Sequence, residues 1–284
     1  MERIGNAKTD PHHSTVQYVF LDSGVGGLPY LQFLLEMHPE ASCLYVADTK
    51  HFPYGEKTKE DVIRFSKEIV EKVITLASPS VIIIACNTMT VSALDILRHT
   101  FNIPFVGTVP AIKTAAKVTK TKNIALIGTK RTLEDEYIRR MKAELAQGCS
   151  LFHSDEGKLV RKIEDELAFA SLEEQLEEVL PIVKSFESSN CDSLILGCTH
   201  FLHLRSAFIK AGKQCNPKIT VVDSLEGVIK QALYLSPMIK ATKTPQLKAF
   251  YASGINSEKD EKKYKKYAEL SGLKFLKNLE LFTF

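Results

Sequence analysis

The chain has 284 residues, with 37 lysine and arginine residues against 34 aspartate and glutamate residues, and a formal net charge of +3. Its length predicts one large domain or two modest ones, and its 44% hydrophobic and 25% charged residues exclude wholesale disorder. The small net charge argues against nucleic acid or a membrane surface as a partner.

Short runs of β-branched and aromatic residues recur along the chain, separated by segments with helical periodicity. The predicted strands are 16–21, 43–47, 81–85, 104–107, 123–127, 193–196, 219–222 and 247–251. Between them, apolar residues at three- and four-residue spacing predict helices over 58–77 and 132–147. The stretch 157–190 has the pattern of a charged amphipathic helix that breaks near residues 170–171 and is interrupted at Pro181.

The repeated strand–helix units predict an α/β fold in which parallel sheets carry helices on both faces. Three patterns occur twice at the ends of predicted strands: Asp-Ser, Gly-Thr, and a cysteine followed by two polar residues. This repetition of strand-end patterns favours two lobes with a site between them. Because ligands of such folds bind at the carboxyl ends of the strands, the residues that follow each strand are the candidates for function.

The longest apolar run, 81–86, is too short to span a membrane, and the first residues lack the apolar core of a signal peptide. We therefore expect a cytoplasmic protein with free thiols.

Two of the six cysteines differ from the others. Cys86 and Cys198 each close an apolar strand, are followed by polar residues and precede a helix whose N-terminal amides favour a thiolate. Three chemistries remain open: a single nucleophile, a redox pair, or two proton-transfer groups facing one carbon. The others are predicted to be structural or incidental: Cys43, Cys149, Cys191 and Cys215.

Two further patterns accompany these cysteines. The sequence DSGVGG, residues 22–27, follows a predicted strand and opens a helix, which is typical of a turn that offers backbone N–H groups to an anion. A tight turn without a ligand explains the same sequence. Cys198 and His200 are separated by one residue, a spacing that could supply half the ligands of a metal site. The sequence holds no convincing complement at ligand spacing, so we expect no metal.

Six short motifs follow one another along the chain. They are 22–28 (DSGVGGL), Pro53-Tyr54-Gly55, Ala85-Cys86-Asn87-Thr88, 109–113 (VPAIK), 127–129 (IGT) and 196–200 (LGCTH). In this order and at this spacing they resemble the cofactor-independent glutamate racemases of the aspartate/glutamate racemase superfamily. The resemblance implies an isomerase that interconverts L- and D-glutamate without pyridoxal phosphate or metal and supplies D-glutamate for peptidoglycan.

The resemblance assigns the proton transfers to the two cysteines. It implies that Cys86 removes the α-proton of the D-enantiomer with help from Asp22, and that Cys198 removes that of the L-enantiomer with help from His200. The other implied residues contact the bound glutamate. They are Ser23, Tyr54 and Gly55 at the side-chain carboxylate, Asn87, Thr88 and Thr129 at the α-carboxylate, Asp22 and Thr199 at the amino group, and Pro53 elsewhere in the binding site.

The resemblance also implies the architecture and the partners. Two similar doubly wound parallel-sheet domains are expected to face each other across an active-site cleft, the first comprising 15–109 plus 224–284 and the second 110–223. Glutamate is the expected small-molecule partner, and a homodimer stays open. Some bacterial relatives with additional N-terminal residues, such as the first fourteen here, need a cell-wall precursor nucleotide as activator.

The chain departs from the usual pattern after the second cysteine, where Phe201-Leu202-His203 replaces a proline and leucines. Two alternatives to a glutamate racemase also follow from the sequence. One is a sibling racemase acting on aspartate, against which Pro53-Tyr54-Gly55 and His200 favour glutamate. The other is a non-catalytic module that binds an acidic ligand or a partner protein, against which the retention of both cysteines favours catalysis.

Overall fold

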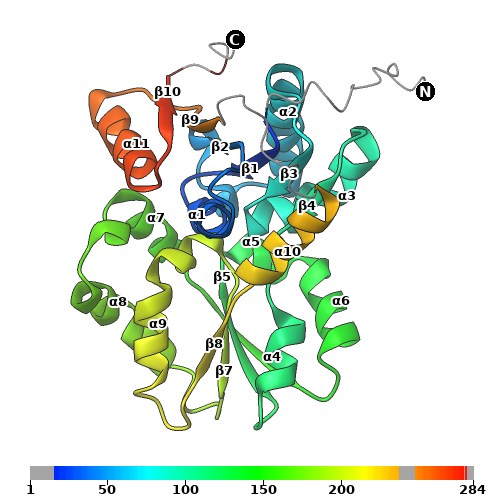
Figure 1. Cartoon of the computed structure of the whole chain (residues 1–284). Coiled ribbons are helices and arrows are strands. Elements are labelled where there is room, and N and C mark those ends of the chain that lie inside the picture. The colour runs from blue at the N-terminus through cyan, green and yellow to red at the C-terminus, as the bar shows by residue number, and fades with distance from the viewer. Residues whose placement is uncertain (1–15, 237–246, 278, 280–284) are drawn as a thin grey trace.

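Two parallel sheets form the framework of the computed structural model, which describes residues 16–236, 247–277 and 279 (Figure 1). Sheet A has the strand order β10-β9-β2-β1-β3-β4 and sheet B has the order β6-β5-β7-β8, with every neighbouring pair parallel. The strands are β1 (Tyr18–Asp22), β2 (Cys43–Ala47), β3 (Val81–Ile84), β4 (Phe105–Gly107), β5 (Asn123–Gly128), β6 (Ser150–Asp155), β7 (Ser193–Leu196), β8 (Thr220–Val222), β9 (Lys248–Ala252) and β10 (Lys274–Leu276).

Helices follow most of the strands and cover the sheets. They are α1 (Leu28–Met37), α2 (Lys59–Ala77), α3 (Asn87–Thr100), α4 (Ile112–Val118), α5 (Lys130–Glu134), α6 (Glu136–Leu145), α7 (Gly157–Asp165), α8 (Leu172–Lys184), α9 (Arg205–Gly212), α10 (Leu225–Leu235) and α11 (Glu258–Leu270). Four short 3-10 helices complete the list: η1 (Thr49–His51), η2 (Tyr54–Glu56), η3 (Leu167–Phe169) and η4 (Thr199–Leu204). Among the described residues, no helix combines the length and the apolar character needed to cross a membrane.

The predicted α/β fold with parallel sheets is confirmed, and each of the eight predicted strands overlaps an observed one. The sequence analysis missed β6 and β10, which lie at the edges of their sheets. The residues of β6, SLFHSD, are half-buried or exposed, so this strand lacks the continuous apolar run that marks a central parallel strand. β10 has only three residues, none fully buried.

Two helix predictions need correction. The helix expected over 132–147 is divided into α5 and α6, because Asp135 stops the first and caps the second by accepting a hydrogen bond from the Tyr137 N–H. The break expected near residues 170–171 is confirmed, since Ser171 forms a capping box at the start of α8. Pro181, however, lies inside α8. Its side chain is exposed, so solvent can satisfy the carbonyl that the missing N–H leaves free.

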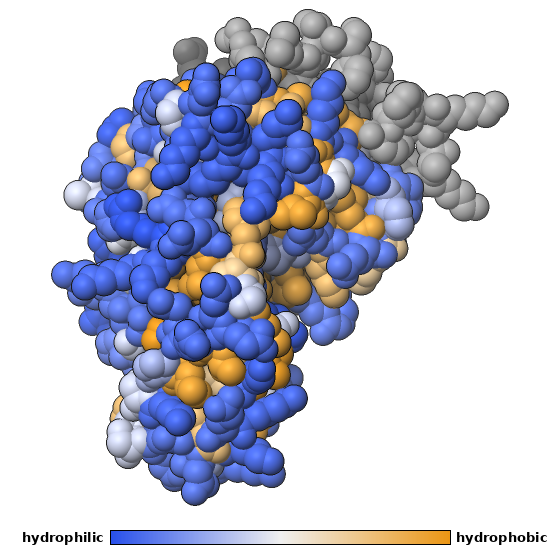
Figure 2. Space-filling view, turned by 90° about the vertical axis from the view of Figure 1, so that its left-hand side faces the viewer, coloured by the Kyte–Doolittle hydropathy of each residue, from blue (hydrophilic) through white to orange (hydrophobic). Residues whose placement is uncertain are grey.

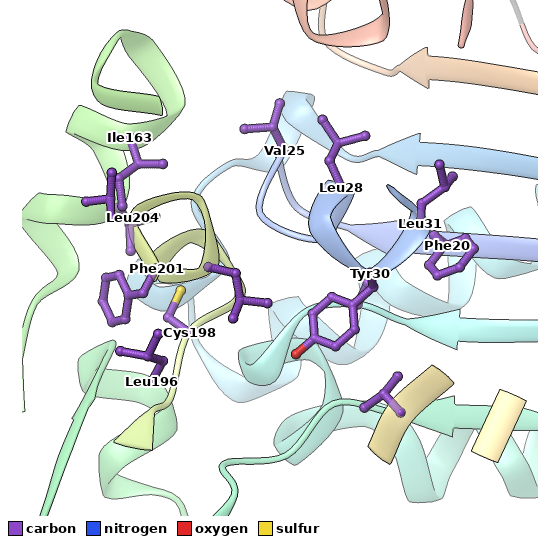
Figure 3. Packing of buried hydrophobic residues seen from close by; sticks show 14 of the residues in the cluster. Phe20, Val25, Leu28, Tyr30, Leu31, Ile163, Leu196, Cys198, Phe201 and Leu204 are labelled. Atoms are coloured by element: carbon purple, nitrogen blue, oxygen red, sulfur yellow. The ribbon is translucent and has the colours of Figure 1, made fainter. Parts of the chain in front are cut away.

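One hydrophobic core cluster extends from sheet A into sheet B. Figure 3 shows Leu28 and Tyr30 of α1 on one side of this cluster and Leu196, Cys198 and Phe201 on the other. After β8 the chain returns to sheet A, where α10 packs against α1 and the β3–β4 side. The division into lobes at residues 109 and 223 stays a prediction.

Candidate active site between the two sheets

The predicted catalytic residues follow strands of both sheets. Asp22 is the last residue of β1, Cys86 follows β3 after one alanine, and Cys198 follows β7 after one glycine. Because the strands within each sheet are parallel, their carboxyl ends share one edge. The two edges are in contact, since the Thr199 hydroxyl donates a hydrogen bond of 2.9 Å to the Asp22 carboxylate. The structure therefore brings the ends of β1 and β7 together.

Cys86 lies where β3 gives way to α3, and only 6% of it is exposed. Burial raises the pKa of its thiol well above the usual value, and the negative charge of Asp22 adds to this effect. The backbone N–H groups of Met89 and Ser23 act in the opposite direction without outweighing burial. The helix amides expected to favour a thiolate are thus present, but Cys86 is a protonated thiol at neutral pH.

Asp22 is a buried carboxylate beside Cys86. It accepts hydrogen bonds from the Thr199 hydroxyl and, at 3.2 Å and 3.3 Å, from the Gly24 N–H and the Ser23 hydroxyl. Burial raises the pKa of Asp22 to about 6, although the charge of His200 and the hydrogen bonds from Thr199 and Gly24 lower it. A carboxyl group with this pKa can exchange a proton near neutral pH.

A second acid–base group lies beside Cys198, which is 8% exposed. His200 in η4 has its Nδ1 atom 3.9 Å from the Cys198 sulfur and its Nε2 atom 2.8 Å from Oε2 of Glu164. Burial by itself lowers the pKa of His200, but the hydrogen bonds to Cys198 and Glu164 and their charges raise it well above its usual value. His200 is therefore an imidazolium at neutral pH, held between a thiol and a carboxylate.

Glu164 of α7 is a site residue that the sequence analysis missed. Its side chain is 1% exposed and also accepts 2.9 Å hydrogen bonds from the Val25 N–H and the Tyr264 hydroxyl. Burial raises the pKa of Glu164, but the hydrogen bond and charge of His200, with those other donors, lower it overall. The sequence contained one indication of its role. Glu164 follows Val160 by four residues on the apolar face of α7, and a buried carboxylate needs partners there because burial without them is costly.

Three threonine hydroxyls join α3 to the end of β5. The Thr88 oxygen lies 3.0 Å from that of Thr129 and 3.1 Å from that of Thr132, and the last two are 3.2 Å apart. Thr88 and Thr129 were predicted as site residues, whereas Thr132 was not. Asn87, also predicted, is buried at the start of α3 and its side-chain amide donates to the Thr108 carbonyl over 3.4 Å.

The predicted group Pro53-Tyr54-Gly55 forms the start of η2. The Tyr54 hydroxyl is already engaged, because it donates a 2.7 Å hydrogen bond to the buried carboxylate of Asp48. Gly55 lies directly against sheet B, since a Cβ atom at this position would stand 2.7 Å from the Cβ atom of Thr129. This segment therefore offers its backbone, rather than the phenol, to a ligand.

A surface pocket of about 830 Å³ lies away from these residues, between α11 and the segment from α7 to α8. Figure 2 shows this side of the molecule, which is mostly hydrophilic, with hydrophobic surface between its upper and lower parts. The pocket is lined by Leu167, Phe169 and Ala170 together with charged residues, and by none of the predicted site residues. Within the described parts of the chain, no group of three or more His, Cys, Asp or Glu side chains is arranged to hold a metal ion.

Gly26 shows how closely the glycine turn of sheet A approaches η4. A Cβ atom on Gly26 would lie 2.6 Å from the Thr199 hydroxyl oxygen and 2.7 Å from the His200 backbone nitrogen. We therefore expect Gly26→Ala to lower the free energy of unfolding by about 3 kcal/mol, because backbone must move to relieve the overlap. Urea denaturation followed by circular dichroism measures this change.

Gly227→Ala is the matched control for Gly26→Ala. Gly227 lies in α10, and an added Cβ atom there meets no atom within 4 Å. Alanine should raise the free energy of unfolding by about 0.5–1 kcal/mol, since glycine is unfavourable inside a helix. Equal stability of the two variants would contradict the close packing of the turn on η4.

The fold and the site define a class of enzyme. The chain matches the Asp/Glu/Hydantoin racemase family over residues 32–232, which is most of its length. It therefore belongs to the Asp/Glu/hydantoin racemase family and is a racemase, that is, an isomerase.

Within that family, the chain is similar to proteins named glutamate racemase. The Treponema pallidum enzyme is 41% identical over 222 residues, which cover 78% of this chain and 81% of the relative. The Pasteurella multocida enzyme is 32% identical over 274 residues, covering 95% and 98%. The crystal structure of Escherichia coli glutamate racemase in complex with L-glutamate and the activator UDP-MurNAc-Ala superposes with a TM-score of 0.78 at 25% identity, covering 92% of this chain and 97% of that one.

Proposed function

We propose that the chain interconverts L-glutamate and D-glutamate by moving the α-proton between Cys86 and Cys198. One observation carries the proposal: two buried thiols follow strands of different sheets, and each has its own titratable neighbour, Asp22 or His200. A racemase must take a proton from one face of the α-carbon and return one to the other face. Groups contributed from two sides of a site suit that task.

In the direction from D-glutamate, the Cys86 thiolate takes the α-proton while the electron pair of the C–H bond stays on carbon. The Cys198 thiol then gives its proton to the opposite face, which completes L-glutamate. Cys86 is left as a thiol and Cys198 as a thiolate, the state required for the reverse reaction. No electrons are gained or lost, and the reaction uses only groups of the protein.

The two neighbours adjust the protonation of the thiols. Asp22, with its pKa raised to about 6 by burial, accepts the proton that Cys86 must lose before it acts as a base. His200, held as an imidazolium by Glu164, stabilises the negative charge of the Cys198 thiolate. Burial of both thiols excludes water, which strengthens these interactions while charge develops on the α-carbon.

Glutamate is bound mainly by backbone N–H groups and hydroxyls in this proposal. The Thr88 and Thr129 hydroxyls, with Asn87, receive the α-carboxylate, and the 3.0 Å separation of the two hydroxyl oxygens supports a shared role for the threonines. The side-chain carboxylate is held by Ser23, Tyr54 and Gly55, with Pro53 beside them. Thr199 and Asp22 receive the amino group.

The product, D-glutamate, would serve peptidoglycan synthesis in the cytoplasm. A homodimer stays a prediction. The solved Escherichia coli glutamate racemase contains UDP-MurNAc-Ala as an activator. For this chain, activation by such a precursor is a prediction. The N-terminal extension that suggested it lies outside the described residues.

The choice of glutamate over aspartate is tested with both amino acids in one coupled assay. We expect kcat/KM for glutamate to exceed that for aspartate by at least about a hundredfold, because a site shaped for the longer side chain misplaces the shorter one. Turnover of aspartate alone would show that the chain is the sibling racemase and would overturn the substrate assignment.

A further inference from the structure

His203 is a histidine of η4 that the proposed reaction does not use. Its Nε2 atom is 2.9 Å from the carbonyl oxygen of Val25, and a carbonyl can only accept, so Nε2 carries the hydrogen. Burial and the positive charge of His200 lower the pKa of His203 to about 4, so the ring is neutral at physiological pH. The ring of Tyr267 packs edge-on against it, with centroids 6.0 Å apart.

Val25 is held on both sides of its backbone by residues that follow strands of sheet B. Its N–H donates to Glu164 over 2.9 Å, and its carbonyl accepts from His203 over the same distance. Figure 3 shows Val25 on the side of the glycine turn that faces Ile163 and Leu204. These two hydrogen bonds fix one residue of sheet A's turn against α7, which carries Glu164, and η4, which carries His200 and His203.

The turn fixed in this way carries Asp22 and Ser23. Inside sheet A, the Tyr45 hydroxyl donates to the Gly24 carbonyl over 2.8 Å and accepts from the Gly27 N–H over 3.0 Å, and the Asp48 N–H donates to the Asp22 carbonyl over 2.8 Å. Tyr45 therefore joins Gly24 and Gly27 within the turn, but it does not set the position of the turn relative to sheet B. That position determines how Asp22 and the rest of the turn meet Thr199 and His200.

We propose that His203 is a positioning residue: through its hydrogen bond to the Val25 carbonyl it sets the glycine turn, and with it Asp22 and Ser23, against Thr199 and His200. The inference rests on the proposed function. His203 touches neither thiol in the described structure, so its effect passes through the turn. Glu164 holds the same residue through its N–H, and within the turn the Leu28 N–H also donates to the Val25 carbonyl over 3.1 Å.

Two variants separate the hydrogen bond from the shape of the ring. His203→Leu removes the donor, whereas His203→Gln keeps an amide N–H of similar reach. We expect kcat/KM for both enantiomers of glutamate to fall about tenfold in His203→Leu, because a small displacement of the acid–base groups is costly. His203→Gln should keep at least about half of the wild-type value, since it restores the donor.

A second readout does not depend on turnover. Alkylation by iodoacetamide, followed residue by residue with mass spectrometry, should be about tenfold faster at Cys86 in His203→Leu than in the wild type, because a loosened turn opens the thiol. The rate at Cys149, which lies in a separate core cluster of sheet B, should not change. Equal loss of activity in both variants, or faster labelling of both cysteines together, would overturn the proposal. A wild type that labels normally but does not racemise glutamate would contradict the proposed function alone.

Discussion

Replacing Cys86 or Cys198 by serine is expected to lower kcat for racemisation by at least about a thousandfold, which corresponds to about 4 kcal/mol of activation free energy. A serine hydroxyl has a far higher pKa than a thiol, so it forms the required base only rarely at neutral pH. Both thiols are needed in either direction, because one takes the proton and the other supplies it. Circular dichroism of glutamate, started from each enantiomer, measures the rate.

The chain provides matched controls for these substitutions. Cys149 and Cys191 are also buried free thiols, but neither follows a strand at the edge where the sheets meet. Cys149→Ser and Cys191→Ser should therefore keep kcat within about twofold, since changes away from the reacting groups seldom alter the chemical step. If Cys86→Ser or Cys198→Ser were as active as these controls, the two-base assignment would be wrong.

Glu164→Gln is expected to lower kcat/KM by about a hundredfold, the size of effect typical of losing one acid–base group. Cys198 and Glu164 together raise the pKa of the buried His200, so removal of the carboxylate lowers that pKa and favours the neutral ring. A neutral ring no longer stabilises the Cys198 thiolate. The alkaline limb of the pH–rate profile should consequently move to lower pH.

The same substitution has a stability effect with a defined pH dependence. We expect the free energy of unfolding to fall by about 2 kcal/mol, since hydrogen bonds to a charged group are lost. Glu164 has a lowered pKa, so its contribution disappears as the pH falls through the folded-state value. His200 has a raised pKa, so its contribution disappears as the pH rises through the folded-state value. The loss should therefore be fullest between about pH 4.3 and 6.5, the unfolded-state values of the two groups.

Asp165→Asn serves as the control for Glu164→Gln. Asp165 is the next residue of α7 and pairs with Lys263 at 3.0 Å, but its side chain is 69% exposed. Removing its charge should change kcat/KM by less than about twofold, because a surface ion pair contributes little. Equal effects of the two substitutions would show that net charge, rather than the buried contact with His200, explains the result.

The residues at strand ends could be predicted from the sequence because parallel strands end at a common edge. That rule made Asp22, Cys86 and Cys198 candidates, and the resemblance joined them in one site. The structure joins Asp22 to Thr199 directly. Glu164 could not be placed in the same way. It lies inside α7 rather than directly after a strand, and it reaches Val25 across 139 positions of the chain.

Other differences arise from packing that the local pattern does not contain. The sequence indicated that helix amides would favour a thiolate at Cys86, but the depth of burial reverses the balance. Similarly, Pro181 was read as an interruption, whereas its exposed position in α8 makes it tolerable. The role of His203 depends on a contact between two elements that are far apart in sequence.

Exchange of the α-proton of glutamate in heavy water tests the central claim most directly, since it reports the substrate and the chemistry together. With purified and reduced protein, we predict that deuterium from solvent appears at the α-carbon of glutamate, whichever enantiomer is supplied, at a rate that follows racemisation. Absence of exchange from either enantiomer would contradict the proposal that Cys86 and Cys198 racemise glutamate.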